Sequence, residues 1–325
     1  STDMHVLLKI NSVLPVSLYG GTERVVWSLA RALSAMGHRV SLAALPGSSC
    51  PFAEVIDLDP RQPLDSQLPS SVDIVHFHSG LEETARPYVV TQHGNSLDTR
   101  DRNSVYVSRQ HAVNHGAECF VHNGLDWDDY PKPRLDRERR GFHFLGKAAW
   151  RVKNVRGAIS ATRRARERLQ VLGGTRLNFT MGFRFTPDRH VTFHGMADDR
   201  KKAEIMMHSK GLLFPVTWHE PFGLAITESL FYGCPVFATP YGSLPELVGA
   251  DFGFLSDSEQ ELAAALATAG EFSARRCHEY ARDCFGADVM ARAYLAVYEK
   301  ALAGESLNPP GGEPVASFRN LPYFT

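Results

Sequence analysis

Short aliphatic segments alternate with amphipathic helical segments along this chain, and that alternation restricts the chain to few folds. Residues 4–10 form a short apolar run and predict a buried first strand. A loop that ends at Gly20-Gly21 follows, and then a helix from Thr22 with one apolar face and a stop at Gly37. Strands that alternate with helices form parallel sheets covered by helices on both faces, so the sequence predicts an α/β protein.

The pattern continues in the first part of the chain and restarts after an interruption. Further strands are expected at 40–45, 73–77, 88–92, 104–107 and 119–121. Residues 126–140 are polar, contain Pro131 and Pro133 and have no periodicity, so we place an interdomain linker there.

The second part of the chain repeats the alternation with clearer helices. Strands are expected at 142–145, 169–172, 191–193, 211–216 and 235–238, and helices at 154–169, 199–208, 222–232, 259–269, 273–284 and 287–303. A chain of 325 residues suits two average domains. We therefore predict two doubly wound α/β domains, at 1–138 and 139–303, with an extended tail at 304–325. Whether the last helix crosses back to the first domain stays open.

The bulk composition excludes several classes of protein. The net charge of -1 and the lack of a basic stripe argue against a nucleic-acid partner. The five cysteines are scattered without metal or redox spacing, which is typical of a reducing compartment. No apolar run reaches the roughly 18 residues of a membrane span, and no signal peptide is recognisable at the start. We expect a cytoplasmic protein with at most weak peripheral contact to the inner face of the membrane.

The segment 219–230 carries the clearest chemical signal. Pro221 suits the first position of a helix, and Gly223 permits close approach to the backbone. The N–H groups of Phe222, Gly223 and Leu224 would lie at the positive end of that helix and form an anion site. Glu220 before the helix and Glu228 within it would suit two sets of sugar hydroxyls on either side of a diphosphate. The alternative is structural: one glutamate satisfies the helix dipole and the other is simply exposed.

Several motifs together resemble one enzyme family. The segment 219–230 resembles the Glu-x7-Glu signature of retaining GT-B glycosyltransferases, in particular the family GT4. The resemblance continues at 233–236 and 242–247, and upstream at Gly20-Gly21-Thr22-Glu23, Gln92-His93-Gly94 and 122–126. It covers about 4–303 and implies the GT-B fold, in which two Rossmann-like domains face each other across a cleft.

The resemblance also implies roles for individual residues. Glu220 is similar to the family's acid that holds the hydroxyls of the donor sugar, and Glu228 to the acid that holds the ribose. His93 resembles a histidine that contacts the donor sugar near the reacting carbon. Gly20 and Gly21 resemble the loop of the first domain that approaches the diphosphate and the acceptor.

Three cations, Lys147, Arg151 and Lys153, lie in the stretch 146–154. Lys153 matches the family's lysine that balances the leaving diphosphate. The family's arginine is replaced by Lys147 unless Arg151 takes its role, and this alternative stays open because a lysine lacks the bidentate fork of arginine.

The sequence predicts no metal site and no cofactor. His76 and His78 would share one face of a strand, but no third ligand accompanies them at clear spacing, so packing is the preferred interpretation.

The predicted function is therefore metal-independent, retaining transfer of a sugar from a nucleotide diphosphate-sugar to a hydroxyl acceptor. UDP-sugars are the favoured donors and GDP-sugars come next. The acceptor, a glycan, a lipid-linked molecule or a small molecule, is not readable. The alternative is a non-catalytic nucleotide-sugar-binding subunit of a glycosyltransferase complex. A nicotinamide oxidoreductase is disfavoured because no Gly-x-Gly-x-x-Gly follows the first strand.

Overall fold

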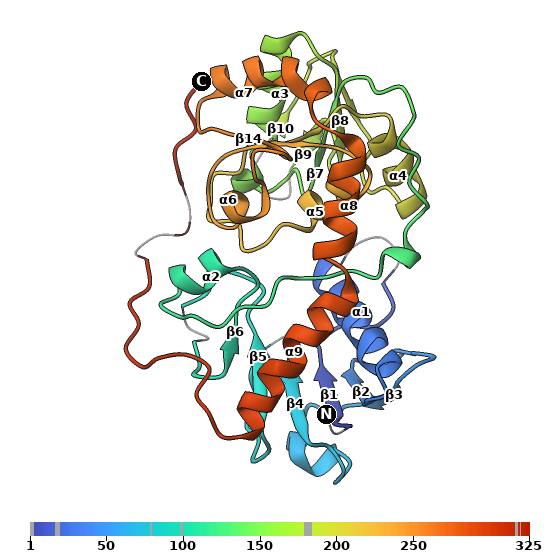
Figure 1. Cartoon of the computed structure of the whole chain (residues 1–325), viewed down its shortest axis with the longest axis vertical. Coiled ribbons are helices and arrows are strands. Elements are labelled where there is room, and N and C mark those ends of the chain that lie inside the picture. Colours follow the sequence, from blue (N-terminus) through green and yellow to red (C-terminus); the bar gives the residue numbers. More distant parts are fainter. Residues whose placement is uncertain are drawn as a thin grey trace. The chain divides into compact units, whose positions relative to one another are not determined.

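The computed structural model of the chain describes residues 3–16, 20–78, 80–97, 100–178, 184–315, 318 and 320–325. The chain divides into two compact units. Unit 1 consists of Ser1–Trp127 and Phe285–Ala316, and unit 2 of Asp128–Cys284 and Ser317–Thr325. Each unit is built around its own parallel sheet (Figure 1).

Unit 1 contains a six-stranded sheet in the order β3-β2-β1-β4-β5-β6. All of its strand pairs are parallel. The strands are β1 (His5–Lys9), β2 (Arg39–Ala44), β3 (Glu54–Asp57), β4 (Ile74–Phe77), β5 (Tyr88–Thr91) and β6 (Ser104–Val105). Strands β1 and β4 are buried along their whole length, as expected for the centre of a sheet covered on both faces.

The helices of unit 1 are α1 (Gly21–Ala35), α2 (Arg109–Asn114) and α9 (Ala287–Leu302), with a short 3-10 helix at Leu64–Gln67. Helices α1 and α9 pack against each other (Figure 1). Two buried tyrosines of α9 bind the sheet: Tyr298 Oη lies 2.6 Å from His76 Nδ1, and Tyr294 Oη lies 2.8 Å from Thr91 Oγ1. These buried hydrogen bonds hold the last helix in unit 1, which answers the question that the sequence left open.

Unit 2 contains a second six-stranded sheet in the order β11-β8-β7-β12-β13-β14. Its strands are β7 (Phe142–Leu145), β8 (Leu169–Leu172), β11 (Val191–Phe193), β12 (Leu212–Phe214), β13 (Val236–Ala238) and β14 (Gly253–Leu255). All of its strand pairs are parallel. A small antiparallel pair, β9 (Leu177–Asn178) and β10 (Arg184–Phe185), stands apart from this sheet.

The helices of unit 2 are α3 (Val155–Ala165), α4 (Asp199–Met207), α5 (Leu224–Phe231), α6 (Leu244–Leu247), α7 (Glu259–Ala265) and α8 (Ala274–Cys284). Short 3-10 helices occur at Trp127–Asp129, where the chain enters this unit, at Arg151–Lys153 and at Leu266–Glu271. Helix α3 packs against α7, and α5 against α8. Phe142, Phe144 and Phe237 are fully buried in the core between the sheet and its helices.

The two sheets share one winding scheme. In each of them the first strand lies in the middle, the next two strands follow on one side and the remaining three on the other. This is the doubly wound order 3-2-1-4-5-6 of a dinucleotide-binding fold. The prediction of two Rossmann-like α/β domains is confirmed.

The boundary between the units differs from the expected one. The structure divides the chain between Trp127 and Asp128, whereas the sequence placed the boundary after residue 138. The polar segment that follows is attached to unit 2: Arg139 donates to the carbonyls of Met206 and Tyr232, and Tyr232 Oη donates to Pro131 O. These contacts connect residues far apart in sequence, so periodicity did not reveal them.

Several local predictions need correction. The strand expected at 119–121 is only a single bridge between Tyr106 and Phe120. The helix expected at 154–169 ends at Ala165, because Arg166 adopts a left-handed conformation with φ 57°. The prediction missed β3, β14, α2 and α6, which are too short to show a period. None of the helices among the described residues is long and apolar enough to cross a membrane.

Candidate active site

The topology of each sheet marks one place for a ligand. Doubly wound sheets bind ligands outside the carboxyl ends of their strands, where the winding direction reverses. That point lies between β1 and β4 in unit 1 and between β7 and β12 in unit 2. The predicted residues lie near both points, and each set is described within its own unit.

The carboxylate of Glu220 is the centre of the polar group in unit 2. It follows β12 and is buried, with 4% of the residue exposed. The ammonium of Lys153 lies 2.8 Å from Oε1 and 3.0 Å from Oε2, and Trp218 Nε1 donates to Oε2 at 2.5 Å. A carboxylate accepts about four hydrogen bonds, so these donors leave it little further capacity, which suits it to hold a small number of hydroxyls.

Tight backbone packing fixes the segment that carries Glu220. The N–H of Thr217 donates to Val152 O, and the N–H of Ser243 donates to Glu220 O. Gly242 packs directly on this segment, because a Cβ there would lie 2.3 Å from both Glu220 N and Glu220 O. Only glycine fits that position, which gives a physical role to the Gly-Ser pair that the sequence singled out.

Lys153 is held in place by the start of α3. Asn154 has a left-handed backbone (φ 60°) and caps the helix, with its side chain accepting from Gly157 N and donating to Pro215 O at 2.8 Å. The Lys153 ammonium lies 5.1 Å from the ring centroid of Trp218 and 5.4 Å from that of Phe214. Aromatic faces attract a cation, so both rings help to hold the lysine. The sequence analysis named neither Asn154 nor Trp218 as a site residue.

The N-terminus of α5 comes directly after Glu220. Gly223 precedes the helix with φ 98°, and a Cβ there would meet Ile226 Cδ1 at 2.8 Å. The first turn of a helix leaves N–H groups without intrahelical partners. Gly223 and Leu224 are partly exposed there, whereas Phe222 is buried and its carbonyl accepts from Ser243 Oγ at 2.6 Å. The turn can therefore receive an anion.

Glu228 pairs with a residue that the sequence did not predict. Its Oε2 lies 3.3 Å from the ammonium of Lys202 in α4, and both side chains are largely buried. This lysine lies in the first turns of α4, where a cation is disfavoured without a partner. That unfavourable position was the signal that could have revealed it.

Lys147 and Arg151 are exposed in the structure. The Lys147 ammonium lies 5.6 Å from the ring centroid of Trp150, and Arg151 belongs to the 3-10 helix that leads to Lys153. The structure thus joins Lys153 directly to Glu220 and leaves the other two cations beside this pair. Which of them takes the arginine role stays open.

In unit 1, Gly20 and Gly21 begin α1. Gly20 has φ 107°, a backbone conformation that favours glycine, and a Cβ there would lie 2.5 Å from Glu23 Oε2 and displace that carboxylate. The Glu23 carboxylate also accepts from Ser12 Oγ at 2.9 Å. Residues 17–19 of the preceding loop lie outside the described residues.

His93 follows β5 and contacts a second histidine. Its Nε2 lies 3.0 Å from Nδ1 of His78, which follows β4. Burial lowers the pKa of His93 to about 4, and burial lowers the pKa of His78 well below its usual value. Both rings are therefore neutral near pH 7. Sequence reasoning named His93 but treated His78 as packing.

Lys9 lies at the same edge of the first sheet, where β1 ends. It is 3% exposed, and its ammonium lies 2.5 Å from Glu82 Oε2 and 2.9 Å from Asn11 Oδ1. A buried lysine persists only with such partners. The reversal point of unit 1 is therefore polar, a property that the β1 sequence pattern did not predict.

The histidine pair considered as a metal site has other partners. His76 contacts Tyr298 Oη and lies 2.7 Å from Thr91 Oγ1, which uses both of its ring nitrogens. Within the described ranges, no group of three or more His, Cys, Asp or Glu side chains is arranged to hold a metal ion.

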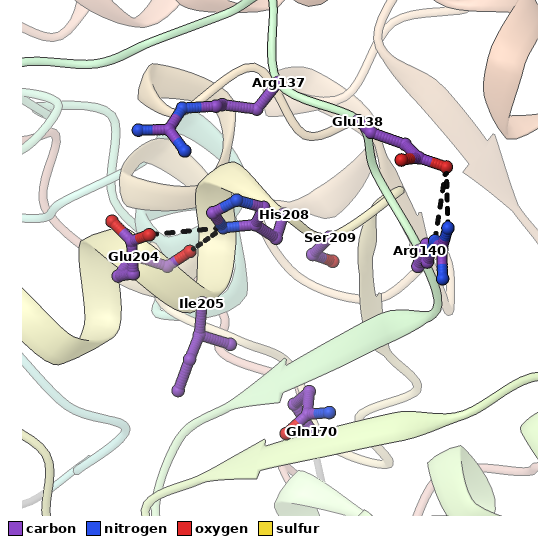
Figure 2. A pocket seen from close by; sticks show the side chains of 8 residues that line it. All are labelled: Arg137, Glu138, Arg140, Gln170, Glu204, Ile205, His208 and Ser209. Carbon is purple, nitrogen blue, oxygen red and sulfur yellow. Dashed lines mark hydrogen bonds and ion pairs between the residues drawn. The ribbon is translucent and has the colours of Figure 1, made fainter.

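A cavity of about 580 Å³ in unit 2 lies apart from these residues (Figure 2). Its lining residues come mainly from segments before the strands: Arg137, Glu138, Arg140, Gln170, Glu204, Ile205, His208 and Ser209. The charges of Glu138 and Arg140 are paired, as are those of Glu204 and His208 if the histidine is protonated (Figure 2). The predicted donor residues follow the carboxyl ends of the strands and do not line this cavity.

A comparison with protein families finds a match for unit 2. Residues 131–283, nearly all of unit 2, match the family model "Glycosyl transferases group 1". The matched residues lie in unit 2 and make up just under half of the chain. This family match confirms the predicted enzyme class, a glycosyltransferase.

Solved structures extend the similarity to both units. The glycosyltransferase AviGT4, involved in avilamycin A biosynthesis, superposes with a TM-score of 0.77 at 21% identity, covering 93% of this chain and 98% of AviGT4. Anabaena Alr3699/HepE in complex with UDP and glucose superposes with a TM-score of 0.64 at 16% identity, covering 91% and 100%. These similarities confirm the GT-B fold.

A curated relative matches over a shorter stretch. An uncharacterized 41.2 kDa protein in the cps region of Klebsiella pneumoniae is 27% identical over 117 residues. The match covers 34% of this chain and 32% of the relative, so it spans about a third of each protein.

Proposed function

We propose that this glycosyltransferase moves a sugar from a nucleotide diphosphate-sugar to a hydroxyl acceptor, with retention of the anomeric configuration and without a metal. The observation that carries the proposal is the carboxylate of Glu220, held by Lys153 and Trp218 directly before the N-terminus of α5. An acid for hydroxyls, a cation and a helix N-terminus are the parts that a sugar diphosphate requires.

The diphosphate would bind at the start of α5. The N–H groups of Phe222, Gly223 and Leu224 would donate to it, and the helix dipole would favour its negative charge. Lys153, with Lys147 or Arg151, would stabilise the charge that grows on the leaving group. These cations take the place of a metal in the proposal.

The two carboxylates would bind different parts of the donor. Glu220 would accept from the sugar hydroxyls with the capacity that Lys153 and Trp218 leave. Glu228 would accept from the ribose hydroxyls, and the ion pair with Lys202 holds that carboxylate in place. The family resemblance implies that, in unit 1, the Gly20-Gly21 turn would approach the diphosphate and His93 would contact the donor sugar.

The transfer step would use the leaving group as the base. The acceptor oxygen forms a bond to the anomeric carbon while the bond from that carbon to the phosphate oxygen breaks, and the acceptor proton passes to a phosphate oxygen. The low pKa of His93, about 4, makes this ring a weak base and agrees with such a route.

UDP-sugars are the favoured donors, with GDP-sugars next. The structure of HepE with UDP and glucose supports UDP, since HepE shares this fold. The acceptor would be a hydroxyl of a glycan, a lipid-linked molecule or a small molecule.

A thermal-shift panel with UDP, GDP, ADP and CMP, each with and without EDTA, tests the donor site. A ligand at about 100 times its dissociation constant adds about 2.7 kcal/mol of stability. We expect a shift with UDP that EDTA does not remove. A shift that EDTA abolishes would overturn metal independence, and no shift with any nucleotide would overturn the donor site.

Product analysis tests the reaction itself. NMR of the purified product should show the anomeric configuration of the donor, and the inverted anomer would refute retention. Protein that binds UDP-sugar yet never releases UDP, with a panel of acceptors or with water, would favour the non-catalytic subunit.

A further inference from the structure

The end of the chain returns to unit 2 after α9 and contacts the segment that carries Glu220. Residues 318 and 320–325 are called the C-terminal segment below. The N–H of Leu321 donates to Thr217 O at 2.9 Å, and the N–H of His219 donates to Phe318 O at 3.4 Å. The rings of His219 and Phe318 meet edge to face with centroids 6.2 Å apart. Backbone bonds thus tie the C-terminal segment to the two residues on either side of Trp218.

Further contacts of the C-terminal segment reach the residue before Gly242 and the start of α7. Tyr241 Oη donates to Pro322 O at 2.6 Å. Tyr241 directly precedes Gly242 and Ser243, which pack on and hydrogen-bond to Glu220. The Phe324 N–H donates to Asp257 O, and the Phe324 carbonyl accepts from Glu259 N.

A third contact reaches the turn that carries Lys153. Tyr323 packs against the core of unit 2, and its Oη donates to Gly157 O at 3.2 Å. Gly157 lies between this ring and Asn154: a Cβ there would meet Asn154 Nδ2 at 2.4 Å and Tyr323 Cε1 at 2.8 Å. The cap formed by Asn154 precedes the helix and directly follows Lys153.

We infer that the C-terminal segment is a positioning element of the donor site. It holds the Glu220 segment and the Lys153 turn in the positions in which they bind the sugar and the diphosphate. This inference rests on the proposed function. The hydrogen bonds of the C-terminal segment reach the residues that flank Glu220 and the helix that begins shortly after Lys153, and Glu220 and Lys153 form the central ion pair. The C-terminal segment would thereby preorganise the site, because the Glu220 carboxylate and the Lys153 ammonium are already in position before the donor binds.

The competing explanation is that the C-terminal segment only stabilises unit 2. Both explanations predict some loss of thermal stability on deletion, so stability cannot separate them. The two explanations differ in the kcat/KM for the donor that they predict per folded molecule, and in the mobility that they predict for the Glu220 segment.

The test compares three variants with the intact chain. One ends after residue 317, one carries Tyr241→Phe and Tyr323→Phe together, and the matched control carries Tyr280→Phe, which removes a similar hydrogen bond, from Tyr280 Oη to Leu247 O at 2.7 Å. All are assayed with a UDP-sugar, using kcat/KM for the donor per folded protein, the UDP thermal shift, and hydrogen exchange at the His219 amide.

We expect the deletion to lower kcat/KM about tenfold or more, because misplaced catalytic groups lose rate steeply. The kcat/KM of the double variant should lie between that of the deletion and that of the intact chain. The kcat/KM of the control should stay within about twofold of that of the intact chain. Exchange at the His219 amide should rise in the deletion. If the deletion does not fold, the double variant decides the question by the same readouts.

The inference would be overturned if the deletion had the same kcat/KM for the donor, per folded molecule, as the intact chain. If the deletion does not fold, the same result in the double variant would overturn it. A loss of kcat/KM in Tyr280→Phe equal to that in the tested variants would also overturn it. An intact chain that neither binds UDP nor transfers sugar would instead refute the proposed function, so the two failures are distinguishable.

Discussion

At the residue scale, the burial of Glu220 changes what its substitution should do. The sequence suggests an open carboxylate whose removal would leave the fold intact. In the structure the carboxylate is buried against Lys153, with side-chain exposures of 5% and 15%. Removing one partner of a buried ion pair leaves the other charge without compensation, so function and stability are linked at this position.

Glu220→Ala and Glu220→Gln should separate these two effects. We expect both to lower transfer by at least about a hundredfold, because neither holds the donor hydroxyls as a carboxylate does. Alanine should also cost about 3 kcal/mol of unfolding free energy by leaving the lysine unpaired, and the isosteric glutamine should cost less. Activity assays and urea denaturation measure the two effects. Wild-type turnover in either variant would contradict the assignment of Glu220.

The contact between His78 and His93 determines which tautomer His93 adopts. One of the two nitrogens, His78 Nδ1 or His93 Nε2, must donate. Among the described residues, the buried His78 Nε2 has no partner, and an orphaned N–H is less tolerable than an orphaned acceptor. His78 therefore donates from Nδ1, and His93 keeps its proton on Nδ1, where it can donate to a substrate oxygen.

His78→Asn and His78→Asp test this tautomer. The amide can still donate to His93 Nε2, whereas an ionised carboxylate can only accept and moves the proton of His93 to Nε2. We expect Asp to lower kcat about tenfold or more relative to Asn, with a smaller change in donor KM. Nitrogen-15 NMR of the imidazoles should show the Nδ1–H form in the intact chain. An Nε2–H form there would refute the argument.

At the element scale, the start of α5 depends on one glycine. Gly223 combines φ 98° with a close approach to Ile226, so a side chain there would be strained by both backbone and packing. The Glu-x7-Glu pattern shows which residues lie near this helix start, but the left-handed turn is visible only in the structure.

Gly223→Ala should weaken nucleotide binding. We expect a loss of about 1–2 kcal/mol in stability from the left-handed backbone and a reduced UDP thermal shift, because the N–H groups move. Gly249→Ala is the matched control in the same unit: it has no heavy atom within 4 Å of an added Cβ and an ordinary φ. An unchanged UDP shift in Gly223→Ala would show that this turn does not bind the diphosphate.

At the scale of the whole molecule, buried histidines make stability depend on pH. Burial lowers the pKa of His93 to about 4 and of His111 to about 3 in unit 1, and of His143 to about 3 in unit 2. The pKa values of His76 and His78 are lowered by burial in the same direction. Most of these neutral rings belong to unit 1.

We expect the chain to lose stability as the pH falls from about 6.5 towards 4, with unit 1 affected most. The unfolded chain binds protons on these rings near pH 6.5 while the folded chain does not, so the full contribution is present above that pH. Each ring contributes a slope of up to about 1.4 kcal/mol per pH unit. Calorimetry with hydrogen exchange resolved by unit can measure this. A flat profile between pH 6.5 and 4.5 would contradict the assignment of neutral buried rings.

The sequence by itself determined the features that depend on neighbours along the chain. The strand–helix alternation sufficed to predict two doubly wound units, because hydrophobic periods report which faces are buried. Glu220, Gly223 and Glu228 lie within one short segment, so their relation to a helix start was also predictable. Very short elements, such as β3 and α2, left no such period.

Only the tertiary structure decided which distant side chains meet. Lys153 reaches Glu220 across 67 positions, Lys202 reaches Glu228 across 26, and His78 reaches His93 across 15. The end of the chain likewise returns to the Glu220 segment, and the polar segment after Trp127 attaches to unit 2. These contacts follow from strand order and core packing, which bring the carboxyl ends of strands together at one edge of a sheet. A local pattern carries no information about that order, so the partners of the site residues emerged only from the folded chain.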